Sequence, residues 1–370
     1  MRSPVYRGAW AIAVCAIVAI LGARYPASAQ NPGYPQNPQN PQNPSYPKSP
    51  SYPQGASPQD KKDKGAQPSD GERQAATKVT SAADFNAALQ AAGEFVKKYP
   101  KSSLRPEITR HLVAKAALNQ DTAQQVTMLE SALAVLKDPA DAEIINPSIL
   151  DAYLKAQKYD EAFRVSTAII EKNPNDLVTL TLMSIVGIDQ ARAQNAKFVP
   201  QSLQWAPKAI ELIETDKRPA LLDDSQWAEY KTKLLAQLYQ ALGVYSMMTG
   251  DFATAKTRLD KSASINQHDP ITYVYLAGVV QEEYAKLAQQ VKSMLPGKTQ
   301  DEALKKALEK MDQMIDLYAR AIGLADGNPQ YQKVRDELSG DLKSYYSYRH
   351  GNSVEGLQQL IDKYKRPQQQ

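Results

Sequence analysis

From Ser81 to the C-terminal region, the sequence is a succession of amphipathic helical patterns separated by short breaks. Apolar residues recur every three or four positions, as in Phe85, Ala88, Ala92 and Val96. Proline follows many of these patterns, and proline excludes the helical conformation from the residue before it. Alternation of apolar and polar residues, the pattern of a strand, is not evident. The sequence therefore predicts an all-α fold.

The expected helix boundaries follow from capping residues and prolines. Starts are expected at a capping box of Ser81 with Asp84, and at Pro106, Asp121 and Asn146-Pro147. Ends are expected at Pro100, at Asp138-Pro139 and, for the helix over Tyr159–Lys172, at Asn173-Pro174. Further helices are expected over 177–195, 202–215, 225–249, 251–265, 271–295, 301–325, 330–349 and 353–364. Because the connections are short, most of these helices should form antiparallel pairs.

The first 29 residues have the features of a secretory signal. Arg2 and Arg7 precede an apolar run over 9–23, and Ala27-Ser28-Ala29 is a small-residue cleavage site. Cleavage after Ala29 predicts an exported protein, periplasmic or extracellular. The alternative is an uncleaved membrane anchor, although the run is shorter than the roughly 20 residues that span a bilayer. Cys15, the single cysteine, lies within this run, so the mature chain would have neither a disulfide nor a thiol nucleophile.

Residues 30–80 are of low complexity and are expected to be a disordered linker. Prolines occupy every third position from Pro32 to Pro53. That period fits one edge of a polyproline II helix, in which the segment 32–53 would span about 65 Å. The segment is a candidate spacer, and tyrosines between the prolines leave a role as a ligand for a proline-binding domain open. Residues 366–370 are expected to be a disordered tail.

Two stretches of the helical region resemble the tetratricopeptide repeat (TPR), a helical hairpin of 34 residues. In residues 146–174, Ile149, Tyr153, Ala162 and Pro174 occupy matching positions, whereas Asn146, Leu150 and Ser166 depart from the pattern. In residues 239–266 the matches are Tyr239, Leu242, Gly243, Ala255 and Leu259. Residues 317–329 and 346–367 look like weaker copies of the second helix.

The resemblance implies an α-α superhelix, a solenoid of about six helical hairpins over residues 81–365. It assigns packing roles within the repeats to Tyr153, Ala162, Pro174, Leu242, Gly243, Ala255 and Leu259. Small residues suit the point where two helices cross, and proline ends a second helix. An irregular helical bundle with similar turns is the alternative architecture.

The resemblance also implies a non-catalytic function, in which the concave face of the solenoid binds a protein or peptide partner. The residues expected to face that groove are Asp151, Leu154, Lys155, Gln240, Val244, Met247 and Met248. The two methionines suit either an adaptable binding surface or an irregular core. The lysine and asparagine clamp with which some members of the family bind chaperone C-termini is absent.

The composition contains no familiar catalytic or cofactor-binding pattern. The three histidines, His111, His268 and His350, do not share metal-ligand spacing, and no glycine-rich phosphate loop is present. No metal and no cofactor are therefore expected. The formal charge of +4 gives no reason to expect nucleic acid. A membrane partner is expected only if the signal segment stays uncleaved.

A second hypothesis is an envelope protein that binds or cleaves glycans in an α/α cavity. Trp205, Trp227, Asp223 and Asp224 lie near one inserted stretch and could line such a cavity. Tyr345, Tyr346 and Tyr348 could similarly form a stacking platform or pack in the core. A deep pocket containing both tryptophans and both aspartates would favour this hypothesis.

Overall fold

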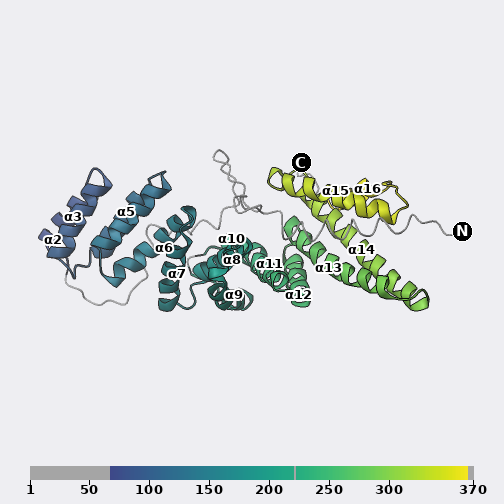
Figure 1. Cartoon of the computed structure of the whole chain (residues 1–370). Coiled ribbons are helices and arrows are strands. Elements are labelled where there is room, and N and C mark those ends of the chain that lie inside the picture. The colour runs from purple at the N-terminus through teal and green to yellow at the C-terminus, as the bar shows by residue number, and fades with distance from the viewer. Residues whose placement is uncertain (1–66, 221, 366–370) are drawn as a thin grey trace. The chain divides into compact units, whose positions relative to one another are not determined.

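The computed structural model describes residues 67–220 and 222–365, and the predicted signal segment, proline-rich spacer and C-terminal tail lie outside these residues. Within this part of the chain every regular element is a helix, and successive helices pack against each other in pairs (Figure 1). The predicted all-α fold of helical hairpins is confirmed. None of these helices is both long and apolar enough to cross a membrane.

The described residues form two compact units. The first comprises residues 67–183 and 219–222, without residue 221, and the second comprises residues 184–218 and 223–365. The division falls within α8, which spans Leu177–Arg192.

The first unit contains six helices before α8. They are α2 (Asp70–Thr80), α3 (Phe85–Lys98), α4 (Arg105–Ala117), α5 (Thr122–Val135), α6 (Pro139–Lys155) and α7 (Tyr159–Lys172). Each packs on the next one along the chain, and α4 also packs on α6. The core between these helices contains fully buried aliphatic and aromatic side chains, among them Phe95, Ile108, Leu112, Ile145 and Ile149.

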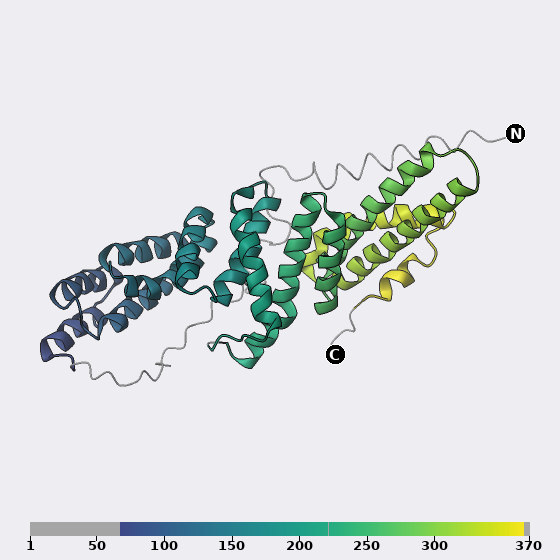
Figure 2. The ribbon, with the colours of Figure 1, turned by 90° about the horizontal axis from the view of Figure 1, so that it is seen from below.

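The second unit contains both short segments and the two longest helices of the described residues, α13 (Pro270–Ser293) and α14 (Lys298–Ala325). In chain order its elements are η2 (Ala196–Phe198), α9 (Val199–Glu214), α10 (Asp224–Glu229), η3 (Tyr230–Leu234), α11 (Leu235–Met248), α12 (Phe252–Ile265), α13, α14, η4 (Pro329–Tyr331), α15 (Gln332–Arg349) and α16 (Leu357–Asp362). Packing is extensive between α11 and α12 and between α13 and α14, and α15 and α16 both pack on α14. Figure 2 shows α13 and α14 side by side.

The prediction of a disordered linker up to Thr80 was wrong at its C-terminal end. Residues 70–80 form α2, which packs on α3 and buries Val79 completely. Ser69 caps this helix in a capping box with Glu72. Ser81, expected to begin the next helix, instead ends α2, and Asp84 alone caps α3 by accepting from the backbone N–H of Ala87. The helix predicted after Ser81 is therefore present as α3, and the capping box belongs to α2, a helix that was not predicted.

Proline positions account for two further corrections. The Asp138-Pro139 pair, expected to end a helix, begins α6, because Asp138 accepts from the Ala140 N–H and Pro139 occupies the first turn. Pro147, expected to open a short helix, lies inside α6, and Pro207 lies inside α9. An internal proline removes one helical hydrogen bond, a cost that tertiary packing offsets in α6, where Ile145 and Ile149 are fully buried.

Two regions of the second unit show a further departure from the predicted helices. The pattern over 225–249 is continuous, but residues Tyr230–Leu234 form a π-helical segment between α10 and α11. The last helix begins at Leu357 instead of residue 353, because Gly356 adopts a left-handed conformation with φ of 85°.

The packing residues predicted from the repeat lie between paired helices. Ala255 and Leu259 of α12 are completely buried against α11, whose Leu242 is 6% exposed. In the first unit, Tyr153 and Ala162 are buried on α6 and α7. Pro174 is exposed and follows Asn173, the residue that caps the end of α7, and its role within the repeat stays a prediction.

Gly243 permits the close crossing of α11 and α12. A Cβ atom at this position would lie 2.8 Å from Cγ of Leu259 and 3.3 Å from the carbonyl oxygen of Ala255. We therefore expect Gly243→Ala to destabilise the chain by about 1–2 kcal/mol in urea unfolding, as overpacking does in other cores. Combining it with Leu259→Ala should cost less than the sum of the two single changes, since the shorter side chain relieves the overlap. Additive costs would contradict the contact.

Candidate partner-binding site

The groove residues predicted on α6 are accessible. Asp151 and Lys155, one helical turn apart, form an ion pair of 2.6 Å with side chains 37% and 56% exposed. Leu154 beside them is half-buried. These three residues are available to a partner, and their binding role stays a prediction.

The groove residues predicted on α11 have different surroundings. Val244 is only 6% exposed and contributes to the core, so it offers almost no surface to a partner. Met247 packs against the cluster that contains Ala255 and Leu259, whereas Met248 is 48% exposed. Of the two uses considered for these methionines, packing describes Met247 and an exposed surface describes Met248.

Gln240, the remaining predicted residue, belongs to a polar network between α11 and α13. Its side-chain amide donates to Oδ2 of Asp269 at 2.5 Å and to the hydroxyl of Thr272 at 2.7 Å. Thr272 is fully buried and lies 3.3 Å from the hydroxyl of Ser262, which donates to the carbonyl of Ala236. Since Asp269 also caps α13, the network fixes the start of that helix. The geometry gives Gln240 a structural role.

The structure shows an open groove between second helices of adjacent hairpins. It lies between α12 and α14, over α13, and has a volume of about 450 Å³. Its apolar lining residues are Leu276, Val280 and Leu317. Its polar lining residues are Lys256, Asp260, Asp312, Gln313 and Asp316. The lining therefore combines an apolar floor with three carboxylates and a single ammonium group.

The three carboxylates of this groove, which we term the α12/α14 groove, are held in place by neighbours. Asp260 pairs with Lys256 at 2.6 Å. Asp312 accepts two hydrogen bonds from the guanidinium of Arg349, at 2.6 and 2.7 Å. A bidentate pair of this kind fixes the orientation of a carboxylate.

The third carboxylate, Asp316, accepts from the hydroxyl of Tyr364 at 2.5 Å. Asp312 also lines a second groove, of about 330 Å³, with Asp301, Leu304, Leu308 and Arg349. The polar edge of the α12/α14 groove is thus continuous with a second surface along α14.

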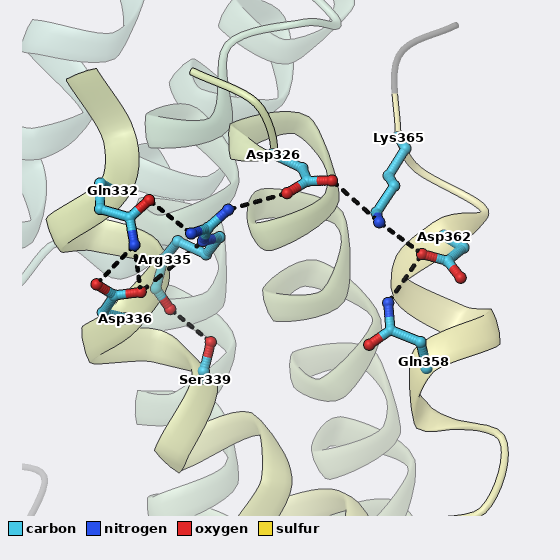
Figure 3. Close-up of polar contacts among 8 residues, drawn as sticks. All are labelled: Asp326, Gln332, Arg335, Asp336, Ser339, Gln358, Asp362 and Lys365. Carbon is cyan, nitrogen blue, oxygen red and sulfur yellow. Dashed lines mark hydrogen bonds and ion pairs between the residues drawn. The ribbon is translucent and has the colours of Figure 1, made fainter. Parts of the chain in front are cut away.

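A polar network at the C-terminal end joins α14, α15 and α16 (Figure 3). Asp326, directly after α14, accepts from Arg335 at 2.9 Å and from Lys365 at 3.0 Å. The Lys365 ammonium, together with Arg335, holds the pKa of the Asp326 carboxyl below its usual value. Lys365 also pairs with Asp362 at 2.9 Å, and these two carboxylates raise its own pKa. The network fastens the last helix without forming a cavity.

The residues proposed for a glycan cavity lie apart from the two grooves described above. The Trp205 and Trp227 side chains are buried, and the indole N–H of Trp227 donates to Asp216 at 2.9 Å. Asp223 caps α10, and the Asp224 side chain is 98% exposed beside Arg218. Neither groove described above contains any of these four residues. Buried indoles and outward carboxylates do not form a sugar-binding surface.

The tyrosine cluster and the histidines have structural environments. Tyr345 and Tyr346 are each 8% exposed in the core around α14, and Tyr348 is 46% exposed. His350 stacks on the ring of Tyr346 at 3.9 Å between centroids, and its Nδ1 lies 2.8 Å from the Tyr346 carbonyl. Across residues 67–220 and 222–365, no group of three or more histidine, cysteine or acidic side chains could hold a metal ion.

The α12/α14 groove was not identified from the sequence, although one signal for it was present. Asp312 and Asp316 are one turn apart on α14, on the face next to the apolar face of Met311 and Ile315. The repeat pattern directed attention to the first helix of each hairpin, whereas all the charged residues that line this groove lie on the second helices α12 and α14.

Comparisons with known proteins leave the chain without an assigned family. No family model matches the sequence, and no curated protein matches it. Among solved structures, the crystal structure of a thermophilic TPR protein of Thermus thermophilus is similar with a TM-score of 0.34 and 14% sequence identity. The match covers 65% of this chain and 98% of that one.

Proposed function

We propose that this protein is an exported, non-catalytic interaction scaffold that binds a protein or peptide partner. The observation that carries the proposal is the α12/α14 groove, an open surface with an apolar floor and fixed carboxylates at its edge. Helical hairpins present such surfaces without depending on the lining residues for stability. The predicted signal and cleavage after Ala29 support a location in the periplasm or outside the cell.

The chemistry of the groove favours a partner segment with one apolar and one cationic side chain. Leu276 and Val280 form the base of the groove but are only 4% and 3% exposed, so an apolar side chain of the partner would mainly contact the partly exposed Leu317 of α14. A lysine or arginine would approach the carboxylates, which outnumber the ammonium groups of the lining. Electrostatic complementarity of this kind contributes mainly to specificity and to the rate of association.

Two ion pairs of the same length and spacing, in opposite order along their helices, allow the proposed surface to be compared with the predicted one. Asp260 pairs with Lys256 in the groove, and Asp151 pairs with Lys155 on α6, in each case at 2.6 Å and one turn apart. Full-length chains carrying Asp260→Lys or Asp151→Lys would be crosslinked in cells, and the attached proteins identified. We expect Asp260→Lys to reduce partner recovery about tenfold, because the new lysine would repel the cationic side chain of the partner.

The outcome of this comparison decides between the surfaces. Loss of the partner with Asp151→Lys alone would place binding on α6 and overturn the groove assignment. Unchanged recovery with both variants, and with Lys155→Ala and Met248→Ala, would exclude both surfaces. Retention of the chain on a glycan column, with no protein recovered, would contradict the scaffold function and favour the glycan-binding alternative.

A further inference from the structure

The hairpin of α13 and α14 extends beyond the helices on either side of it. Phe252 is the first residue of α12, and its ring contacts Lys286 of α13, whose ammonium lies 5.2 Å from the ring centroid. Arg349, the last residue of α15, meets α14 at Asp312. Helix α13 continues to Ser293 and α14 begins at Lys298, so the intervening end of the hairpin projects past its neighbours (Figures 1 and 2).

The end of this hairpin is a turn that is fixed by hydrogen bonds and exposes an apolar residue. The Gln300 amide donates to the carbonyls of Val291 and Met294, at 3.1 and 3.3 Å, and so joins the two helices at the turn. Gly297 has φ of 156° and ψ of −179°, a conformation open essentially to glycine alone. Held in this way, Leu295 is 89% exposed, the highest value among the exposed large hydrophobic side chains of residues 67–220 and 222–365.

Lysines surround this apolar apex. The segment Lys292-Ser-Met-Leu-Pro-Gly-Lys298 has a lysine at each end and no acidic residue. Over residues 286–306 there are five lysines and two acidic residues. A projecting apolar tip with a cationic base is the arrangement that allows a protein to enter the headgroup region of an anionic bilayer.

We propose that the tip of the α13/α14 hairpin, residues 292–298, is a binding site for the surface of an anionic membrane. Leu295, with Met294, enters the headgroup region, and Lys292 and Lys298 contact the phosphates. A membrane is favoured over a protein partner because the apolar residue stands at a convex apex, which meets a flat surface first. The site is separate from the α12/α14 groove, so either proposal can fail without the other.

The test needs a signal that comes from the tip itself, because the apolar run 9–23 of the full chain would also attract lipid. A nitroxide is attached to a cysteine replacing Ser293, in a full chain that carries Cys15→Ser. Its accessibility to oxygen and to a water-soluble nickel complex is measured with phosphatidylglycerol or phosphatidylcholine vesicles. We expect the label to become oxygen-accessible and protected from nickel with phosphatidylglycerol only.

The matched control is a second exposed leucine. Leu118, in the first unit, is 78% exposed. A label attached at Gln120 lies two residues from Leu118 in the sequence, as the label at Ser293 lies two residues from Leu295. Leu295→Asp should reduce the inserted fraction of the Ser293 label at least about tenfold, from the loss of one buried leucine. Lys292→Glu and Lys298→Glu should each reduce it about fivefold or more. Leu118→Asp should leave it unchanged.

Three results would overturn the proposal. The first is a Ser293 label that stays accessible to nickel with both kinds of vesicle. The second is equal insertion into phosphatidylcholine, which would exclude the role given to the lysines. The third is equal insertion of the label at Gln120, which would show non-specific adsorption.

Discussion

Replacing Asp141 with alanine is expected to destabilise the first unit by about 3–5 kcal/mol, the cost of leaving a buried charge without its partner. Arg105 donates from Nε to Oδ2 of Asp141 at 2.7 Å, and its second guanidinium nitrogen lies 2.6 Å from the same oxygen. Thr109 donates to Oδ1 at 2.8 Å. The side chains of Asp141 and Arg105 are only 2% and 13% exposed, so water cannot replace the lost contacts.

The measurement is urea unfolding followed by circular dichroism, with Asp151→Ala as the control. Asp151 forms an exposed ion pair within the same helix, and such a pair contributes about 0.3–0.5 kcal/mol. Replacing both members of the buried pair, as Arg105→Met with Asp141→Leu, should recover most of the stability, because no unpaired charge remains. If Asp141→Ala were as mild as Asp151→Ala, the buried pair would not have the importance assigned to it.

Gly323→Ala is expected to release α16 from α14 and to lower the free energy of unfolding of the second unit by about 3 kcal/mol. A Cβ atom at Gly323 would lie 2.5 Å from the carbonyl oxygen of Ile361 and 2.9 Å from Cβ of Tyr364. The nearest of these atoms is main chain, so a rotamer change cannot relieve the overlap and the helix must move. Its movement would also break the hydrogen bond from Tyr364 to Asp316.

Hydrogen exchange of the α16 amides measures this effect directly. In the variant, amides of residues 360–364 should exchange as in an unfolded chain, while those of α13 keep their protection. Gly340→Ala on α15 is the matched control, because no atom lies within 4 Å of the added Cβ. That change should stabilise the chain by up to about 1 kcal/mol through helix propensity. Protected α16 amides in Gly323→Ala would contradict the close approach seen here.

The sequence was sufficient for the fold class because the helical period is a local property. Ala255, Leu259 and Gly243 have the side-chain sizes that a helix crossing requires, and the structure places them at one. Proline was less informative, since Pro139, which was expected to end a helix, begins one. A proline is compatible with either the first turn or the residue after a helix, and tertiary packing decides between them.

The candidate site could not be predicted to the same degree because it depends on contacts between distant segments. The Asp312–Arg349 and Asp316–Tyr364 contacts join residues 37 and 48 positions apart. A repeat pattern describes one hairpin at a time and contains no information about such pairs. Gln240 illustrates the same limit, since its partners Asp269 and Thr272 lie in the next hairpin.

The π-helical segment Tyr230–Leu234 has a consequence for how the chain is compared with other repeat proteins. A π turn closes its hydrogen bonds over five residues instead of four, so the helix faces before and after it are out of phase. Helices α10 and α11 are joined without a break by this segment, so the face of Trp227 and the face of Gly243 do not follow one common helical period. A sequence profile of fixed repeat length would therefore be out of register after this segment, and an alignment of repeats should allow one gap position there.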